Sequence, residues 1–263
     1  MTTLPRLAVV TGASSGIGAA LVRALAARGE PVLAVARRHD RLEGLAAEAL
    51  AAGHALIHTM ALDLTVEGAP LALAAEARRL GVPWLLVNNA GFGRYGRFEG
   101  TDAGQLASMM RLNCEALVLL THALLPDLKA SGGGTVLNVA SAAGFQATPF
   151  MSVYGATKAF VLSFTEGLDE ELRGEGVRAL AFCPGPVATE FGDVAGIGER
   201  FHAVPGRLTA EEAAAAALQQ VEDGEPVSVP GPLNKAATTL SQVLPRGVVR
   251  WATSKLFRPV ERP

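Results

Sequence analysis

Short apolar runs alternate with longer helical patterns along almost the whole of this sequence. The apolar runs have the length of buried strands and are predicted at 6–10, 32–36, 55–60, 84–88, 134–139, 177–182 and 226–229. Helical patterns fill the intervals at 15–28, 40–52, 67–80, 102–130, 152–174 and 209–222. Because strands joined by helices favour a parallel sheet covered on both faces, we expect a doubly wound, mainly parallel α/β fold.

The ends of several predicted helices carry residues that commonly start or stop a helix. Asp40 begins a D-x-x-E pattern and Asp102 a D-x-x-Q pattern, and both resemble capping boxes. Gly29 and Gly53 follow predicted helices where a glycine commonly ends the last turn. Since no linker, repeat or charge block divides the chain, we expect one domain over residues 1–230, followed by a helical extension at 231–263.

Composition restricts the class of protein further. The 263 residues are 49% hydrophobic, which is ample for a core, and the net charge of −2 gives no reason to expect a nucleic-acid partner. Cys114 and Cys183 show neither metal-ligand spacing nor a paired framework, which fits a reducing compartment and predicts no metal site. The N-terminus shows no signal-peptide pattern, and the longest uncharged run, 130–157, is broken by Gly, Ser and Pro, so we expect a cytoplasmic protein.

The first predicted strand leads into a glycine-rich turn, TGASSGIG, and then a helix. Glycines let the backbone approach a diphosphate, and a helix N-terminus offers N–H groups and a favourable dipole. The spacing is G-x-x-x-G-x-G rather than G-x-G-x-x-G, and a purely structural turn is the alternative. The position in the first βα unit favours a nucleotide. The predicted contacts are Gly12, Ser14, Ser15, Gly16, Ile17 and Gly18.

The end of the second predicted strand bears on which nucleotide would bind. In dinucleotide folds an acid near this point holds the ribose 2′-OH, whereas an arginine accommodates a 2′-phosphate. Ala36 offers no carboxylate, and Arg37 and Arg38 offer two cations. A solvated basic pair is the alternative. The missing acid favours a phosphorylated ribose, and therefore NADP(H) over NAD(H).

Tyr154 and Lys158 stand four residues apart in a predicted helix, and Ser141 precedes the tyrosine by thirteen residues. Residues at this spacing share one helix face, so the lysine cation can favour the phenolate. Moving a tyrosine pKa from ~10 to ~7 needs about 4 kcal/mol, roughly what one cation at ~4 Å supplies in a medium of dielectric ~20. The serine hydroxyl could then hold a carbonyl oxygen beside the phenol.

Two polar residues interrupt apolar helix stripes. Asn113 falls inside the stripe of helix 102–130, and a buried amide needs hydrogen-bond partners. Lys158 leads an apolar face that continues through Val161 and Leu168, which is costly for a lysine unless it is paired or functional. A satisfied core asparagine and a snorkelling structural lysine are the alternatives.

Taken together, Thr11-Gly12 to Gly18, Asn88-Asn89-Ala90-Gly91, Asn113, Ser141, Tyr154-x-x-x-Lys158 and Pro184-Gly185 resemble the short-chain dehydrogenase/reductase family in its common single-domain form. The resemblance covers roughly residues 5–230. It implies a seven-stranded Rossmann-type sheet, an NAD(P)(H) cofactor bound by the 1–230 catalytic domain, and a tetrad of Asn113, Ser141, Tyr154 and Lys158. It also implies further cofactor contacts at Asp63, Asn89, Ala90, Gly91, Pro184, Gly185, Val187 and Thr189, with Tyr154 and Lys158.

The resemblance also implies a mechanism. Tyr154 would act as the acid/base, Ser141 would hold the carbonyl oxygen, Lys158 would bind the nicotinamide ribose, and Asn113 would connect a water to the lysine. We therefore expect an NADP(H)-dependent oxidoreductase, a carbonyl reductase or alcohol dehydrogenase. The alternative is a regulatory protein that binds NADP(H) without turnover, and a third reading is a structural subunit.

Substrate and assembly are less constrained by the sequence. The expected pocket walls, 92–98, 145–151 and 187–204, are mostly apolar and aromatic, which suits a hydrophobic carbonyl or secondary alcohol. Surplus apolar faces on the two longest helices predict a homodimer or homotetramer. Residues 240–258 form a basic amphipathic pattern that could touch a membrane surface. We favour instead packing over the domain or on a partner subunit.

Overall fold

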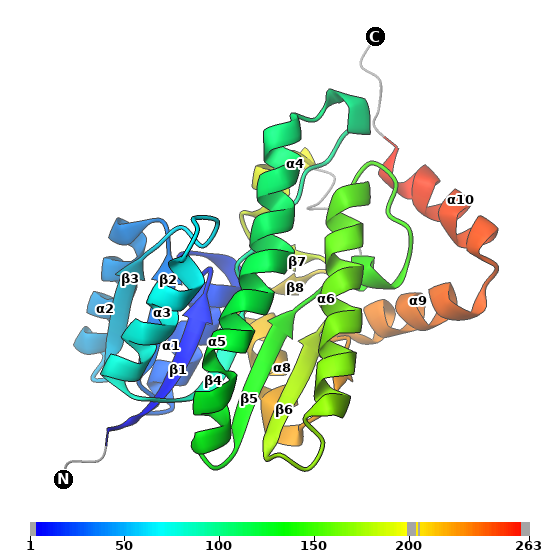
Figure 1. Ribbon diagram of the computed structural model, residues 1–263. Coiled ribbons are helices and arrows are strands. Elements are labelled where there is room, and N and C mark those ends of the chain that lie inside the picture. Colours follow the sequence, from blue (N-terminus) through cyan, green and yellow to red (C-terminus); the bar gives the residue numbers. More distant parts are fainter. Residues whose placement is uncertain (1–3, 199–203, 205, 259–263) are drawn as a thin grey trace.

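The computed structural model describes residues 4–198, 204 and 206–258, and its centre is a seven-stranded parallel sheet. The strands lie in the order β3-β2-β1-β4-β5-β6-β9 (Figure 1). Their bounds are Arg6–Thr11 (β1), Val32–Ala36 (β2), Ile57–Ala61 (β3), Val82–Asn88 (β4), Gly134–Val139 (β5), Val177–Phe182 (β6) and Val227–Ser228 (β9). Each strand overlaps its predicted range, and the doubly wound Rossmann-type fold is confirmed. The order reverses between β1 and β4, so the carboxyl ends of these strands border the crevice where such folds bind ligands.

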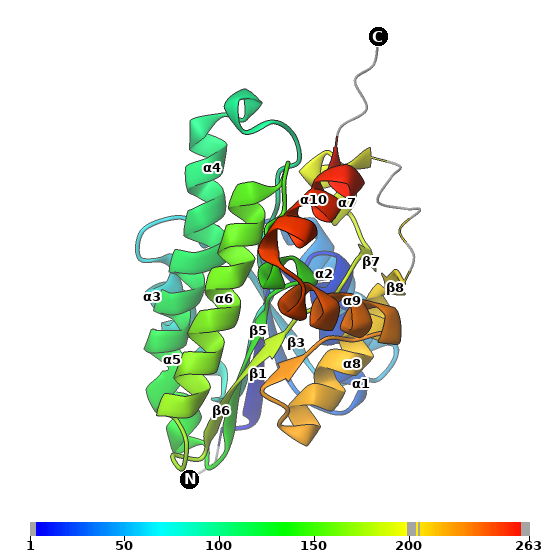
Figure 2. The ribbon, with the colours of Figure 1, turned by 90° about the vertical axis from the view of Figure 1, so that its right-hand side faces the viewer.

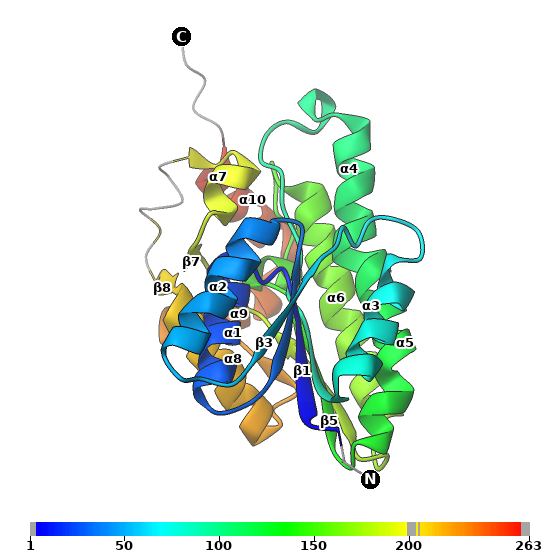
Figure 3. The same ribbon diagram turned by 90° about the vertical axis from the view of Figure 1, so that its left-hand side faces the viewer.

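Helices cover both faces of the sheet (Figure 3). One face carries Gly16–Ala27 (α1), His39–Ala51 (α2) and Ala210–Asp223 (α8). The other carries Ala69–Leu80 (α3), Leu117–Ala130 (α5) and Ser152–Glu171 (α6). The central strands are buried on both faces and are therefore mostly apolar, whereas β3 at the sheet edge is only partly buried.

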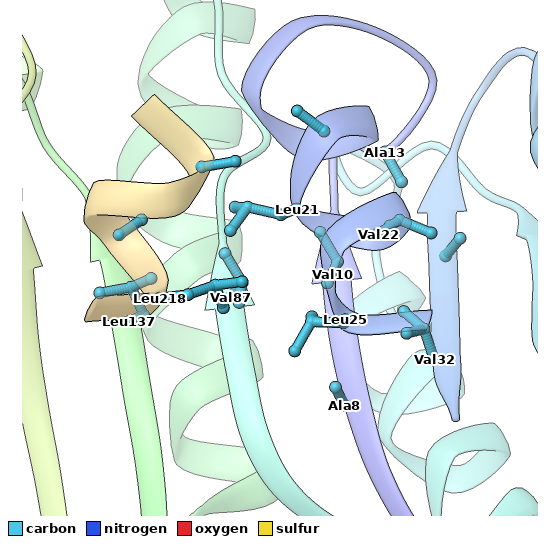
Figure 4. Close-up of a cluster of buried hydrophobic side chains, with 14 of the residues drawn as sticks. Ala8, Val10, Ala13, Leu21, Val22, Leu25, Val32, Val87, Leu137 and Leu218 are labelled. Atoms are coloured by element: carbon cyan, nitrogen blue, oxygen red, sulfur yellow. The ribbon is translucent and has the colours of Figure 1, made fainter. Parts of the chain in front are cut away.

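The core divides into layers according to the alternation of side chains along each strand. Ala8 and Val10 point to the side of α1 and α8, where they join Leu21 and other apolar side chains (Figure 4). Leu7 and Val9 point to the opposite side, into the cluster that includes residues of α3 and α5. Both clusters consist of fully buried side chains, so the strand ends that carry the site rest on a rigid base.

The predicted helix 102–130 is divided into three parts. Ala103–Met110 (α4) is followed by a π-helical turn, Arg111–Ala116 (η2), and then by α5. π-helical turns inside α-helices are rare and frequently lie at functional sites. Asn113, the residue that interrupted the apolar stripe, lies in this turn.

The helix ends agree with the sequence in part. Asp102 caps α4 by accepting a hydrogen bond from the Gln105 N–H at 2.9 Å, which is one of the two bonds of the predicted capping box. The capping box predicted at Asp40 is wrong, because α2 begins one residue earlier, at His39, and Asp40 lies inside the first turn. There its charge still favours the helix dipole. A reciprocal capping box does occur between Thr209 and Glu212 at the start of α8.

Beyond the sheet, shorter elements lie around the carboxyl ends of the strands. They are a two-stranded pair, Val187–Ala188 (β7) and Leu208–Thr209 (β8), and the helices Phe191–Ala195 (α7), Pro232–Val243 (α9) and Arg246–Phe257 (α10). The end of α10 lies near α7 (Figure 2). In the described part of the chain, no helix is both long and apolar enough to cross a membrane.

Candidate active site

The glycine-rich turn between β1 and α1 is tied to the segment that follows β4. The Asn89 amide donates to the backbone carbonyls of Thr11 at 2.8 Å and Gly12 at 3.2 Å. A Cβ on Gly18 would lie 2.4 Å from the Gly12 carbonyl oxygen, and Gly12 itself has a φ of 68°. These glycines are therefore required by the tightness of the turn and by the approach of Asn89.

The Thr11 hydroxyl fixes the start of this segment. It donates to the Val87 carbonyl at 3.2 Å and accepts from the N–H groups of Asn89 and Ala90, each at 3.0 Å. The first turn of α1 begins after Ser15, whose side chain does not cap it. The N–H groups of that turn can thus face an anion such as a diphosphate.

Arg38 reaches across to the glycine-rich turn. Its guanidinium donates to the Ser14 hydroxyl at 3.1 Å, the Ser15 hydroxyl at 2.8 Å and the Glu190 carboxylate at 2.8 Å. The hydrogen bond from Arg38 lowers the pKa of Glu190, and the more distant Arg41, at 3.6 Å, adds to it. Sequence reasoning missed Glu190, because nothing local in the sequence places it opposite β2.

Arg37 and Asp63 lie at the carboxyl ends of neighbouring strands. Arg37 is exposed just beyond β2, and Asp63 follows β3 and accepts two hydrogen bonds from Thr65, at 2.9 Å and 2.7 Å. Burial tends to raise the pKa of Asp63, but the Thr65 hydrogen bonds and the Arg37 charge leave it lowered. The structure thus brings the predicted adenosine-side residues to one edge of the sheet.

Lys158 is buried in α6 with its ammonium against a strand end. Its Nζ donates to the Val139 carbonyl at 2.6 Å. Burial lowers the pKa of Lys158 to about 8, while Cys114 and Cys183 act in the opposite direction. The snorkelling alternative is wrong, because the lysine head points inward rather than to water.

Tyr154 lies one helical turn before Lys158 on the same face of α6. The residue is partly exposed, but its hydroxyl is buried and hydrogen-bonded to Ser141. Burial raises the pKa of Tyr154 to about 12, and the Ser141 hydrogen bond only partly opposes this. The Lys158 Nζ lies 5.9 Å from the centre of the tyrosine ring. Among the protein's own groups burial therefore dominates, and a lowering of this pKa by Lys158 together with an oxidised, cationic nicotinamide stays a prediction.

Asn113 binds the loop after β4 to helix α6. Its amide donates to the Phe92 carbonyl and the Thr157 hydroxyl, each at 3.0 Å, and its oxygen accepts from the Phe92 N–H at 3.1 Å. The buried side chain is thus fully satisfied, as a core asparagine requires. A Cβ on Gly91 would meet the Asn113 oxygen at 3.0 Å and the Lys158 Nζ at 3.7 Å, so this tie lies directly beside the lysine.

The surroundings of Tyr154 on its other side are apolar. The rings of Tyr154 and Phe191 lie 5.2 Å apart at 48°. A Cβ on Gly93 would lie 2.9 Å from Phe191, 3.1 Å from Met151 and 3.2 Å from the tyrosine ring. Two of the three expected pocket walls, 92–98 and 145–151, therefore contact this face of Tyr154, as does α7. The third expected wall is 187–204, and its residues 199–203 lie outside the described residues.

Loop 92–97 is anchored at several points around this apolar side. The Tyr95 N–H donates to the Ala195 carbonyl at 2.8 Å, and its hydroxyl donates to the Phe257 carbonyl at 2.8 Å. The Gly96 N–H donates to the carbonyl of Phe150 at 2.8 Å. Phe150 has a φ of 65°, which is unusual for a residue other than glycine and marks local strain in this wall.

The segment after β6 closes the site from the far side. Thr189 packs on Gly16, where a Cβ would lie 2.8 Å from the threonine methyl. A Cβ on Gly185 would clash with Asn234 of α9, at 2.3 Å from its Oδ1, and Asn234 donates to the carbonyls of Gly206 and Pro230, each at 3.1 Å. Sequence reasoning missed Asn234, because it follows the last β-strand and belongs to no motif.

Pro184 and Val187 connect the same segment to the rest of the site. The Ala142 N–H, next to Ser141, donates to the Pro184 carbonyl at 2.9 Å. Val187 begins β7 and pairs with Leu208 of β8. Ile17, in the first turn of α1, packs at the edge of the core. All four members of the predicted tetrad and the predicted cofactor contacts thus lie around the carboxyl ends of the strands.

Comparison with known proteins agrees with this geometry. The chain belongs to the short-chain dehydrogenase/reductase family, and it matches the short chain dehydrogenase family over residues 6–200. A sulfoacetaldehyde reductase of Chromohalobacter salexigens is 39% identical over 69% of this chain and 72% of its own. The chain is therefore an oxidoreductase by family.

Solved structures are similar over nearly the whole chain. A short-chain dehydrogenase from Sphingobium yanoikuyae in complex with NADPH has a TM-score of 0.80 and 33% identity, covering 92% of this chain and 97% of its own. A bulky-bulky ketone specific alcohol dehydrogenase from Comamonas testosteroni has a TM-score of 0.75 and 29% identity, covering 93% of this chain and 96% of its own.

Proposed function

We propose that this protein is an NADP(H)-dependent oxidoreductase that interconverts hydrophobic carbonyl compounds and secondary alcohols, with Tyr154 as the acid/base. One observation carries the proposal: the buried Tyr154 hydroxyl interacts with Ser141, one turn from the buried Lys158 ammonium, and the tyrosine ring packs against an apolar wall that includes Phe191. A proton donor beside an apolar surface is the arrangement that reduction of a hydrophobic carbonyl needs.

Ser141, Tyr154 and Lys158 would have different roles in the reaction. A bound nicotinamide cofactor would supply the hydride. Ser141 would hold the substrate oxygen, and Tyr154 would donate its hydroxyl proton to that oxygen. Lys158 is protonated at neutral pH, because its pKa of about 8 lies above 7. Its charge would therefore stabilise the tyrosinate left after the proton has moved.

The Asn113 side chain positions neighbouring segments and takes no part in the chemical step. Its two amide protons are donated to the Phe92 carbonyl and the Thr157 hydroxyl, and its oxygen accepts from the Phe92 N–H. We infer that it fixes the loop beside Lys158 and so the place of the cofactor ribose. That a water connects Asn113 to Lys158 stays a prediction. Such a water would have to bind the backbone of the π-helical turn.

The chain offers a suitable cradle for the cofactor. The uncapped first turn of α1 suits the diphosphate, and Asn89, Ala90 and Gly91 line the path towards Lys158. Arg37 and Arg38, together with the missing acid at Ala36, favour a 2′-phosphate. The NADPH complex of the Sphingobium yanoikuyae relative supports this preference.

The apolar wall decides which substrates we expect. Phe191, Met151 and the tyrosine ring crowd Gly93, whereas Arg94 is bound to the Val194 carbonyl at 3.0 Å. Phe191, Met151 and the tyrosine ring therefore suit a bulky, hydrophobic ketone. The ketone-specific relative from Comamonas testosteroni supports this choice. Both cysteines are free in the described structure, which fits the proposed cytoplasmic location.

The assay is a panel of hydrophobic and charged carbonyl compounds, followed by NADPH absorbance. We expect turnover on bulky hydrophobic ketones and much weaker turnover on small anionic aldehydes. Cofactor binding without turnover on any member of the panel would contradict the proposal and favour a regulatory protein.

A further inference from the structure

The two C-terminal helices, α9 and α10, bury mostly small polar side chains, with Val249 as an apolar exception, and expose most of their large apolar ones. They bury small polar side chains: Asn234, Thr238 and Thr253 are 8%, 6% and 6% exposed. They expose large apolar ones: Leu240 is 54% exposed and Trp251 is 65% exposed. A surface helix normally does the reverse, so these helices present apolar area for which their own domain provides no cover.

We call the exposed apolar side chains of these two helices together the C-terminal apolar face. On α9, Leu233, Ala236, Ala237 and Leu240 recur at helical spacing, and on α10 Val248 and Trp251 do so. The large members of the face are Leu233, Leu240, Val243, Leu244, Val248, Trp251 and Leu256, all between 37% and 73% exposed. Each helix has 12 residues, too few to span a bilayer but enough to lie along its surface.

The charged residues of α9 and α10 and of the residue that follows all have one sign. Residues 232–258 contain no Asp or Glu and five exposed cations, of which Lys235, Arg246, Arg250 and Lys255 lie in the two helices. None of these four forms an ion pair with any residue of the described chain. Elsewhere on the described surface arginines commonly do pair with carboxylates. Examples are Arg23 with Glu48, Arg78 with Asp127 and Arg178 with Asp169.

We propose that α9 and α10 dock this protein on an anionic lipid surface, which replaces the contact with a partner subunit expected from the sequence. The C-terminal apolar face would enter the boundary between headgroups and acyl chains, where Trp251 has a favourable position. The four unpaired cations would meet anionic headgroups. A second copy of the chain fits the face less well, because pairing the same face across a two-fold axis would bring cations against cations.

The docked face lies beside the proposed active site. The Phe257 carbonyl at the end of α10 accepts the hydrogen bond from the Tyr95 hydroxyl, and Tyr95 belongs to the loop that borders Tyr154. Docking would thus bring that loop close to the lipid, where a hydrophobic carbonyl would be dissolved. This last consequence rests on the proposed function, whereas docking itself does not.

The experiment is co-sedimentation of the full chain with vesicles, which needs no enzymatic activity. Each cation near an anionic surface strengthens binding by roughly fivefold, so four should contribute several hundredfold. We expect binding to vesicles of phosphatidylcholine with phosphatidylglycerol at low salt, and at least ~100-fold weaker binding to phosphatidylcholine alone. Raising the ionic strength should release the protein.

Two sets of variants separate charge from apolar contact. Arg246→Glu with Arg250→Glu and Lys255→Glu should weaken binding by at least ~100-fold. Leu240→Ser with Trp251→Ser should weaken it by at least ~10-fold. The matched control is Leu50→Ser with Leu71→Ser, which removes leucines that are 76% and 65% exposed on α2 and α3. The control should bind like the parent, and circular dichroism should show all variants folded.

Three results would overturn the proposal. One is the absence of binding to the anionic vesicles, and another is equal binding to neutral ones. The third is a change in oligomeric state, by light scattering without lipid, when Leu240 and Trp251 are replaced. That result would make the face a contact between copies of the chain.

Discussion

Arg38 is predicted to set the preference between the two nicotinamide cofactors, and Arg38→Ala tests this. Its guanidinium already binds Ser14, Ser15 and Glu190 at the mouth of the glycine-rich turn. A 2′-phosphate carries close to two negative charges, and a charge-assisted hydrogen bond to it contributes about 1.5–3 kcal/mol. The loss of that contact should lower kcat/KM for NADPH by roughly 10- to 150-fold, with a much smaller change for NADH.

Glu190 is expected to have the opposite effect on kcat/KM for NADPH. Its carboxylate occupies the guanidinium that the phosphate would use and would repel the phosphate. An exposed ion pair of this kind contributes about 0.2–1 kcal/mol. Glu190→Gln should therefore raise kcat/KM for NADPH by up to about fivefold and leave NADH nearly unchanged.

The assay is kcat/KM for NADPH and NADH with one ketone in the parent and these variants. The double variant Ala36→Asp with Arg37→Ala should invert the preference, because it removes a cation and adds a repelling carboxylate. An equal loss for both cofactors in Arg38→Ala would refute the reasoning. It would mean that Arg38 only orders the glycine-rich turn through Ser14 and Ser15.

Three further predictions follow from buried and exposed side chains. The pKa of Lys158 is about 8 in the folded protein, below its ordinary 10.5, so its ammonium costs stability below pH 8. Lys158→Met should raise the free energy of unfolding at pH 7 by up to about 3 kcal/mol, a gain that shrinks as pH rises to 10.5, by urea denaturation. Asn113→Ala should lower that free energy by about 1–3 kcal/mol, because the Phe92 backbone loses both partners, and the same denaturation measures it. The exposed Phe160 and Leu119 border a groove between α5 and α6. We expect light scattering to show a homodimer or homotetramer, which Phe160→Glu should dissociate. A monomeric parent protein at micromolar concentration would count against this assembly.

The sequence predicts the sheet well because its periodicity is a local property. Strands buried on both faces must be apolar, so their positions can be found without knowing their neighbours. The glycines of the first turn could be predicted from their place between a strand and a helix, although Asn89 and Thr189, which crowd them, come from distant segments. The π-helical turn at Asn113 was visible only as an amide in an apolar stripe, because its geometry depends on the bonds to Phe92 and Thr157.

What the sequence did not predict depends on contacts between distant segments. Glu190 meets Arg38 across 152 positions, and Asn234 reaches Gly185 from a helix outside every motif. The pKa of Tyr154 depends on burial of its hydroxyl, which the spacing of Tyr154 and Lys158 in the sequence does not show. The apolar pattern of α10 was visible, but only the fold shows that this face points away from the domain.

The most direct test of the proposed function is single-turnover reduction of a bulky hydrophobic ketone by NADPH in the parent and in Tyr154→Phe. The substitution removes the hydroxyl bonded to Ser141 and keeps the ring packed on Phe191. We expect the rate to fall by at least ~10²-fold, with NADPH affinity within a few-fold of the parent. A variant that reduces the ketone at a rate near that of the parent would contradict the assignment of Tyr154 as the acid/base.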